Sequence, residues 1–233
     1  MAESIKILHT QEEICNQGCE FFIQANPTHD TRFSSAYLRW LSARKKGGEP
    51  YSSSQQKAAE YINEIAQNEY AAQLEELSSL HVLLYKDPTN DKEFNAKDMN
   101  STEYVKMMLK AGADIRYCET DNPIRLAIQD NNLLLSWSSS DNDRDTPLSK
   151  KTVNQGMYYT GVPNNDPLIN YYTKYFDRLF DKAKKVKLNQ KGEIKDTDSK
   201  IRSIVNYCKT NKGQIWFDVI LSVIFLILGY LIS

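Results

Sequence analysis

The 233-residue sequence has few of the residue types on which most catalytic and metal sites depend. It contains three histidines, four cysteines and nine glycines. Cys15 and Cys19 have the spacing of one helix face, but no second pair of cysteines or histidines lies near them to complete a zinc site. A glycine-rich phosphate loop and an HExxH pattern are also missing. The sequence therefore predicts no metal, no cofactor and no conventional catalytic centre.

An excess of charge of either sign is also missing. Lysine and arginine together number 29 and aspartate and glutamate 30, which gives a formal net charge of −1. This balance argues against broad attraction to nucleic acid or anionic lipid, although local patches, and a nucleic-acid partner, stay open. The opening residues MAESIKILHT contain no apolar stretch of secretory type. We therefore expect the bulk of the chain to face the cytosol, with its cysteines reduced.

One long apolar run is present, from residue 215 to residue 232. It reads IWFDVILSVIFLILGYLI, and Asp218 is its only charge. A helix of this length measures about 27 Å, close to the ~30 Å hydrocarbon thickness of a bilayer. A buried core helix is the alternative, but apolar side chains occur on every side of the run. The run therefore predicts a single transmembrane helix.

The two ends of this run carry residues that suit the membrane interfaces. Trp216 and Tyr230 lie near opposite ends, where amphipathic rings favour the headgroup level, and Asp218 is close enough to the start to remain in the interface. Lys209 and Lys212 precede the run, and no basic residue follows it. By the positive-inside rule the amino-terminal mass stays in the cytosol. We expect a tail-anchored membrane protein.

The remainder of the sequence alternates between predicted helices and predicted strands. We expect helices over residues 10–17, 34–46, 52–79, 100–112 and 166–187, and strands over residues 19–25, 81–85, 114–118, 124–128, 133–137 and 156–162. The expected helix caps are Thr10 with Glu13, Ser52 or Ser53, and Asp166 with Pro167, and the expected hairpin turn is Asp130-Asn131-Asn132. Such alternation predicts an α/β fold with a mixed β-sheet sandwiched by helices. Residues 1–187 would form one cytosolic domain. Residues 188–214 would form a polar stalk that could include a short amphipathic helix.

This order of elements resembles one repeat of the phospholipase D-like superfamily. The segments that carry the resemblance are VKMMLKAGADIRYCE, IRLAIQDNNLLLSWSSS, GMYYTGVP and NYYTKYFDRLFDKAKK. In that family one strand bears His-x-Lys, followed by four residues, Asp, six residues and Gly-Ser-x-Asn. With Asp130 in the place of the Asp, Pro123 falls on the His and Arg125 on the Lys. The Gly, Ser and Asn places are taken by Trp137, Ser138 and Ser140.

The altered motif implies a site without the family's nucleophile. In the family a histidine attacks phosphorus and a second histidine protonates the leaving oxygen, whereas Pro123 has no side chain that can do either. We therefore expect no catalytic residue at this place. The resemblance implies instead a pocket in which Arg125, Asp130 and Ser138 bind an anionic or phosphate-bearing ligand, because guanidinium matches phosphate geometry. A salt bridge from Arg125 to Asp130 or to Asp114 is the structural alternative.

Three functions follow from these features. The first is a tail-anchored, catalytically degenerate phospholipase D-like domain that acts as a binding or sensing module. Single-repeat members of the family pair two copies, so the resemblance implies a C2 homodimer. The second is a signal-responsive effector of defence or toxin type, whose clustered tail helices perturb the membrane. The third is a phosphodiesterase or nuclease with a rearranged active site.

Overall fold

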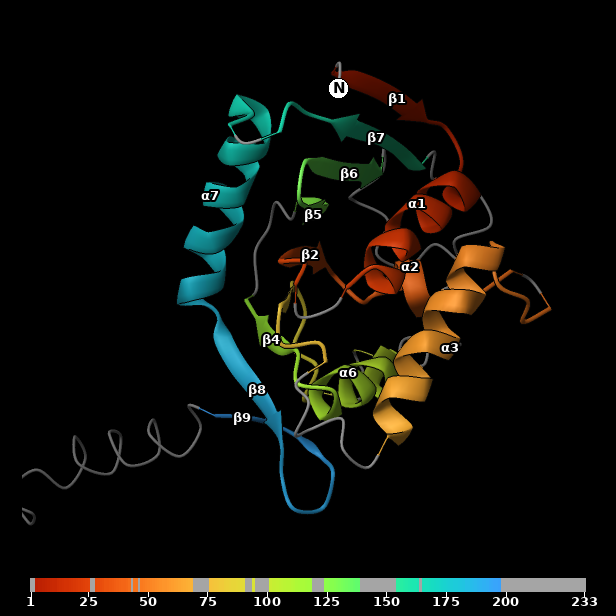
Figure 1. Cartoon of the computed structure of the whole chain (residues 1–233). Coiled ribbons are helices and arrows are strands. Elements are labelled where there is room, and N and C mark those ends of the chain that lie inside the picture. The colour runs from red at the N-terminus through yellow and green to blue at the C-terminus, as the bar shows by residue number, and fades with distance from the viewer. Residues whose placement is uncertain are drawn as a thin grey trace, which may run out of the picture. The chain divides into compact units, whose positions relative to one another are not determined.

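The chain folds around one mixed β-sheet with helices on both faces (Figure 1). The computed structural model describes residues 3–25, 28–42, 44–45, 47–68, 76–90, 94, 101–118, 124–138, 154–163 and 165–197. The strands are β1 Ser4–Leu8, β2 Thr31–Ser35, β3 Leu80–Leu84, β4 Asp114–Tyr117, β5 Arg125–Gln129, β6 Asn132–Ser138, β7 Asn154–Thr160, β8 Lys184–Leu188 and β9 Ile194–Asp196. The helices are α1 Gln11–Ile23, α2 Arg39–Ser42, α3 Ser53–Gln67, α6 Ser101–Lys110 and α7 Pro167–Lys182.

The strand directions define two sides of the sheet, one where the parallel strands end and one where they begin. The order is β1-β7-β6-β5-β2-β3-β4-β8-β9, and β2, β3 and β4 run parallel. We call the side where these three strands end the carboxyl edge, and the side where they begin the amino edge. β5 and β6 form an antiparallel hairpin that turns at the amino edge and opens at the carboxyl edge. In α/β sheets, ligand sites occur at the carboxyl ends of parallel strands.

Two hydrophobic cores lie on the two faces of the sheet. Helices α1, α2, α3 and α6 cover one face, and α7 covers the other (Figure 1). Phe22, Phe33 and Val105 belong to the first core. Leu126 and Phe176 belong to the second, which lies under α7. The predicted α/β fold, with a mixed sheet between helices, is therefore confirmed for the part of the chain that the structure describes.

The strand predicted over residues 19–25 is wrong, because this segment is the second half of α1. Thr10 caps the helix, and Glu13 completes the capping box that the sequence predicted. The helix then continues through the apolar run to Ile23. Gly18 allows the close approach of another side chain, since a Cβ atom there would lie 2.4 Å from the Trp40 ring. A short apolar run cannot by itself distinguish a buried strand from a buried helix face.

The predicted helix over residues 34–46 is mostly wrong. Residues 31–35 form β2, which pairs with β3 on one side and β5 on the other, and among the described residues of the predicted range only α2 is helical. β2 has the sequence TRFSS, in which Phe33 is the only large apolar residue. Its place in the middle of the sheet comes from tertiary pairing rather than from local propensity.

Helix signals elsewhere in the sequence are confirmed. Ser52 caps α3, and Asp166 caps α7 with Pro167 in its first turn. α7 ends at Lys182, earlier than expected, and β8 and β9 then extend the sheet past residue 187, where we expected a polar stalk to begin. Val186 and Ile194 explain this extension, because both are buried in the first core.

No helix within the described ranges is long and apolar enough to cross a bilayer. The predicted transmembrane helix over residues 215–232, with its interface residues Trp216, Asp218 and Tyr230, lies outside the described residues. The same is true of the predicted stalk from residue 198 onward.

Asp166 should contribute strongly to stability, because its buried carboxylate ties α7 to β7. It accepts hydrogen bonds from the Tyr159 hydroxyl at 2.6 Å and from the backbone N–H groups of Val162, Leu168 and Ile169. We predict that Asp166→Ala lowers the melting temperature of the full chain in mild detergent by about 5 °C or more. Asp181→Ala, in an exposed position on the same helix, is the control. Equal melting temperatures for the two variants would contradict this role.

The same carboxylate predicts a loss of stability in acid. The hydrogen bond from Tyr159, together with the backbone N–H groups, holds the pKa of Asp166 below its usual value. A group whose pKa is lowered by folding contributes stability above its unfolded pKa of about 4 and loses it as the pH falls through the folded pKa. Thermal unfolding from pH 7 to pH 3 should therefore show a smaller acid-induced decrease for Asp166→Asn than for the parent chain.

Candidate functional site

The three residues predicted to bind a ligand do not line one pocket. Arg125 begins β5 at the carboxyl edge, and Asp130 follows the same strand in the hairpin turn at the amino edge, with φ 52°. Residues five positions apart along a strand are about 17 Å apart. Ser138 ends β6 at the carboxyl edge. The register therefore brings Arg125 and Ser138 to the same edge and separates both from Asp130.

A buried serine that the sequence analysis missed lies beside Arg125. Ser136 is the cross-strand partner of Arg125 in the β5–β6 ladder, two positions before Ser138. The residue is only 7% exposed, and its Oγ atom has no hydrogen-bond partner among the described residues. Burying an unpaired hydroxyl is costly, so such a group needs a water or a ligand atom as partner. Arg125 and Ser136 therefore form the best candidate for a polar ligand site at this edge.

The start of β5 is held in place by the side chains of Ser34, on β2, and of Tyr85, the residue after β3. The Ser34 hydroxyl donates to the carbonyl oxygen of Ile124 at 2.7 Å, and the Tyr85 hydroxyl donates to the same oxygen at 2.8 Å. The backbone N–H of Leu126 donates to Ser34 Oγ at 3.1 Å. Burial raises the pKa of Tyr85, so its hydroxyl stays protonated and continues to donate. These bonds fix the backbone that carries Arg125.

Both salt bridges that we considered for Arg125 are wrong. Asp130 pairs with His29, whose Nδ1 atom lies 2.9 Å from the carboxylate, at the amino edge. Asp114 also lies at the amino edge, where it pairs with Arg116 at 3.0 Å and Lys185 at 3.1 Å. Strand register separates both carboxylates from the carboxyl edge, so neither can pair with Arg125.

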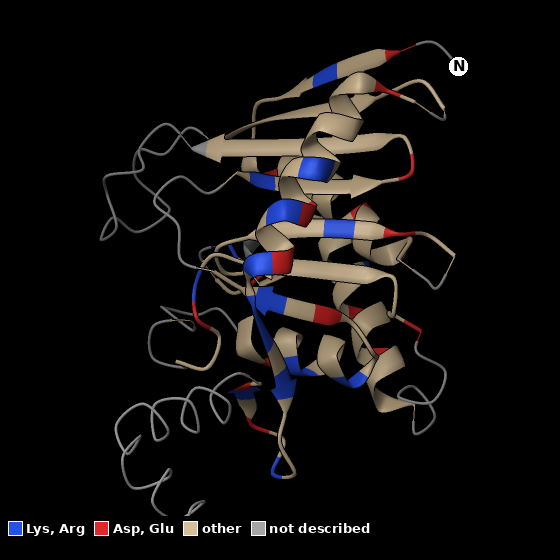
Figure 2. Ribbon diagram, turned by 90° about the vertical axis from the view of Figure 1, so that its left-hand side faces the viewer, with Lys and Arg blue, Asp and Glu red and all other residues tan. Residues whose placement is uncertain are grey.

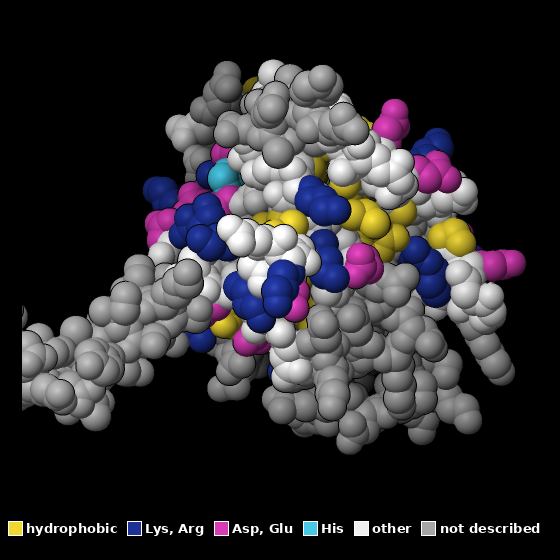
Figure 3. Space-filling view, turned by 90° about the horizontal axis from the view of Figure 1, so that it is seen from below, with side chains coloured by type: hydrophobic (Ala, Val, Ile, Leu, Met, Phe, Trp, Pro, Cys, Tyr) yellow, Lys and Arg dark blue, Asp and Glu magenta, His cyan; other side chains and the backbone are white. Residues whose placement is uncertain are grey.

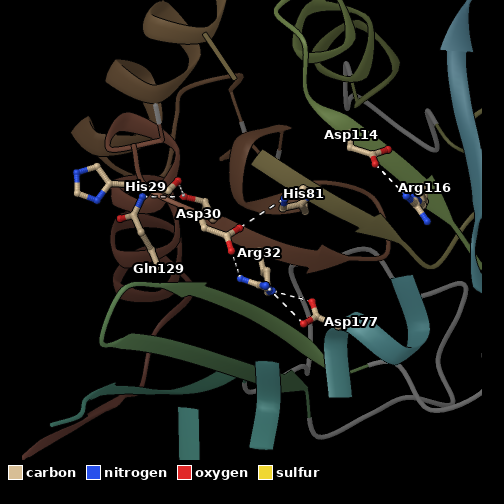
Figure 4. Close-up of polar contacts among 9 residues, drawn as sticks. His29, Asp30, Arg32, His81, Asp114, Arg116, Gln129 and Asp177 are labelled. Atoms are coloured by element: carbon tan, nitrogen blue, oxygen red, sulfur yellow. Dashed lines mark hydrogen bonds and ion pairs between the residues drawn. The ribbon is translucent and has the colours of Figure 1, made fainter. Parts of the chain in front are cut away.

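The amino edge carries a separate polar network between the sheet and α7. Figure 2 colours the basic and acidic positions along the ribbon, and Figure 4 draws the side chains of this network as sticks. Arg32 of β2 donates to Asp177 of α7 at 2.8 Å and also pairs with Asp30. His81 Nε2 lies 3.5 Å from Asp30, and its ring packs edge-on against Phe180. These contacts attach α7 to the sheet.

The charge of Arg32 is stabilised despite its burial. Burial by itself would lower the pKa of Arg32, but Asp177 and Asp30 raise it above its usual value. Its side chain is 19% exposed, whereas His29 and Asp130 are 43% and 52% exposed. The Arg32 network is therefore a partly buried structural contact, and the His29 pair is a solvent-screened surface contact.

No histidine lies beside Arg125, although all three are described. His29 and His81 are at the amino edge. His9 follows β1 near the carboxyl edge, but β1 is three strands from β5, a lateral separation of about 14 Å. Position 123, where the family's nucleophile would stand, and Ser140 lie outside the described residues.

Two of the four cysteines, Cys15 and Cys19, are buried in the hydrophobic interior. Cys15 and Cys19 are both fully buried on α1, and the Cys19 thiol donates to the carbonyl oxygen of Trp40 at 3.1 Å. Burial raises the pKa of Cys15 to about 11, so this thiol stays neutral. Both side chains act as core residues.

Comparisons with known proteins do not place the chain in a family. No protein-family model matches the sequence, and no curated protein matches it. The resemblance to the phospholipase D-like superfamily therefore stays a prediction.

The two polar contacts at the amino edge should differ in their contribution to stability. We predict that Arg32→Gln, which leaves Asp177 and Asp30 without their guanidinium, lowers the free energy of unfolding by about 2 kcal/mol. His29→Gln should lower it by less than about 1 kcal/mol, because the pair it breaks is exposed. Urea unfolding of the full chain in mild detergent measures both values. A larger loss for His29→Gln would contradict this assignment.

Proposed function

We propose that the chain is a membrane-tethered binding module. Its single domain is a catalytically degenerate phospholipase D-like domain, and its carboxyl edge holds an anionic, phosphate-bearing ligand. The observation that supports this proposal is that Arg125 and Ser136 are cross-strand neighbours in the β5–β6 ladder. The buried Ser136 hydroxyl has no hydrogen-bond partner among the described residues. A guanidinium and a hydroxyl on neighbouring strands can donate to two oxygens of one phosphate.

The same geometry favours binding over hydrolysis. A histidine mechanism needs an imidazole within hydrogen-bond reach of the scissile phosphate. His29 and His81 lie at the opposite edge, and the motif position for the nucleophile is Pro123. Ser136 has no histidine beside it that could take its proton. A ligand that reaches Arg125 would therefore be held and not cleaved.

Membrane attachment enters the proposal through residues 215–232. Their length and continuous apolar character suit a single membrane-spanning helix, which would keep the described domain at the cytosolic surface. A binding module at that surface could report on a soluble or lipid-borne phosphate.

Self-association is the part of the proposal supported by the edge strand β1. Ile5 is 64% exposed and Ile7 47% exposed, and their cross-strand partners on β7 are Tyr159 and Met157. An edge strand with exposed apolar side chains and unpaired backbone groups can pair with an identical strand about a two-fold axis. A second copy is therefore the expected partner. Clustering of tails, as in an effector, would build on this contact.

The ligand proposal predicts a specific loss of binding. Arg125→Ala should weaken the binding of inorganic phosphate by about 10- to 100-fold, because it removes charge-assisted hydrogen bonds. Isothermal titration of the detergent-solubilised full chain measures the dissociation constant. Arg178→Ala is the matched control, since this exposed arginine lies on α7, which covers the second core, whereas Arg125 shares a sheet face with Ala127 of the first core. Unchanged affinity in Arg125→Ala would remove the phosphate site from the proposal.

The self-association proposal predicts a change in mass. The double variant Ile5→Lys/Ile7→Lys should halve the mass of the protein in the detergent complex, because like charges and lost apolar contact oppose β1 pairing. Light scattering with subtraction of bound detergent gives this mass. Tyr171→Lys is the control, because Tyr171 is as exposed as Ile5 but lies on α7. A parent chain with the mass of one copy would contradict the dimer.

A further inference from the structure

Lysines are concentrated on the β8–β9 hairpin and its entry from α7. Residues 182–196 contain six lysines against two carboxylates, a net charge of +4, in a chain whose formal net charge is −1. Lysine and arginine side chains gather on the face of the domain shown in Figure 3, and basic positions run along β8 in Figure 2. The chain therefore has a local basic surface, although its overall charge is nearly balanced.

The hairpin separates an apolar side from a basic side. Val186 and Ile194 point into the first core and are nearly fully buried. Because side chains alternate along a strand, Lys185, Lys187 and Lys195 point to the other side, and all three are exposed. The buried side anchors the hairpin to the sheet, so the basic side is held on a rigid support.

Some of these lysines form ion pairs with nearby carboxylates, whereas Lys187 and Lys191 form none with a described carboxylate. Lys185 pairs with Asp114 at 3.1 Å, and Lys195 lies 3.5 Å from Glu193. Lys187 and Lys191 are exposed, and neither forms an ion pair with a described carboxylate. Their charges are available to a partner with negative charge.

The position of the hairpin in the chain favours a bilayer as that partner. β9 ends at Asp196, and the predicted membrane helix begins at Ile215, so only 18 residues connect them. Such a connection spans at most about 60 Å. A tether of this length keeps the hairpin close to the membrane at high effective concentration, whereas a nucleic acid would have to reach it from solution. Attraction to anionic headgroups acts over about 8 Å at physiological salt, a distance the tether allows.

We propose that the basic side of the β8–β9 hairpin, together with Lys191 in its turn, docks against anionic lipid headgroups of the membrane that holds the tail. This inference rests on the proposed membrane tether. Docking would fix the orientation of the domain relative to the membrane through a second point of attachment. Net contact would be strongest for bilayers rich in phosphatidylserine or a similar anionic lipid.

The test uses the full chain reconstituted into vesicles, with cleavage after Glu193 by a glutamate-specific protease as the readout. Glu193 follows the hairpin turn and is exposed. We expect cleavage to be at least about fivefold slower on phosphatidylcholine vesicles with ~30% phosphatidylserine than on pure phosphatidylcholine. The protection should disappear at about 500 mM salt, where the screening length falls to a few ångströms. It should also disappear in Lys187→Gln/Lys191→Gln but persist in the matched control Lys6→Gln/Lys57→Gln, whose lysines are exposed on β1 and α3.

Three other outcomes of this experiment would each contradict one part of the proposal. Failure of the full chain to float with neutral vesicles after an alkaline wash would overturn the membrane tether, and the docking proposal with it. Retention on vesicles with equal cleavage on neutral and anionic lipid would overturn docking alone and leave the tether intact. Protection on neutral vesicles by a single-stranded oligonucleotide, without protection by phosphatidylserine, would replace the lipid by nucleic acid as the partner.

Discussion

The position of β5 between β2 and β6 is the constraint on which the candidate site depends. At the carboxyl edge, Ser34 and Tyr85 both donate to the carbonyl oxygen of Ile124. At the amino edge, the hairpin turn places Asp130 beside His29. Between these ends the ladder sets Arg125 opposite Ser136. Because the register is fixed at both ends, the arginine cannot slide toward either carboxylate that we considered as its partner.

The polar residues at the two edges of the sheet have different roles. At the amino edge, Arg32 joins β2 to Asp177 of α7, and this contact supports the second core. At the carboxyl edge, Arg125 begins β5, and its cross-strand partner Ser136 lies two residues before the end of β6. A residue in the first group should affect folding, and a residue in the second should affect binding. The membrane-facing proposal concerns a third region, the lysine-rich hairpin that follows α7.

The sequence predicted the elements that carry strong local signals. The caps at Thr10, Ser52 and Asp166 and the hairpin turn after β5 are confirmed, because each depends on a few neighbouring residues. β2 could not be predicted, since its sequence is mostly polar and its strand state depends on pairing with β3 and β5. The apolar run that completes α1 was predicted as a strand, because its burial pattern depends on contacts with Trp40 and the sheet.

The site was only partly predictable for a similar reason. The motif spacing identified Arg125 and Ser138, which lie at one edge, but it also grouped Asp130 with them, although the strand carries it to the other edge. Ser136 could have been found from the hairpin register, since a two-residue turn after Gln129 sets it opposite Arg125. Its burial and its missing partner come only from the packed structure.

The central claim is that the site at Arg125 binds a phosphate-bearing ligand without cleaving it, and a phosphodiester tests both parts of this claim. The most direct measurement is nuclear magnetic resonance of the full chain labelled at arginine nitrogen, with bis-p-nitrophenyl phosphate added and released p-nitrophenolate followed in the same sample. The account predicts that the Arg125 side-chain resonance shifts while no p-nitrophenolate forms. Release of p-nitrophenolate that Arg125→Ala abolishes would contradict it.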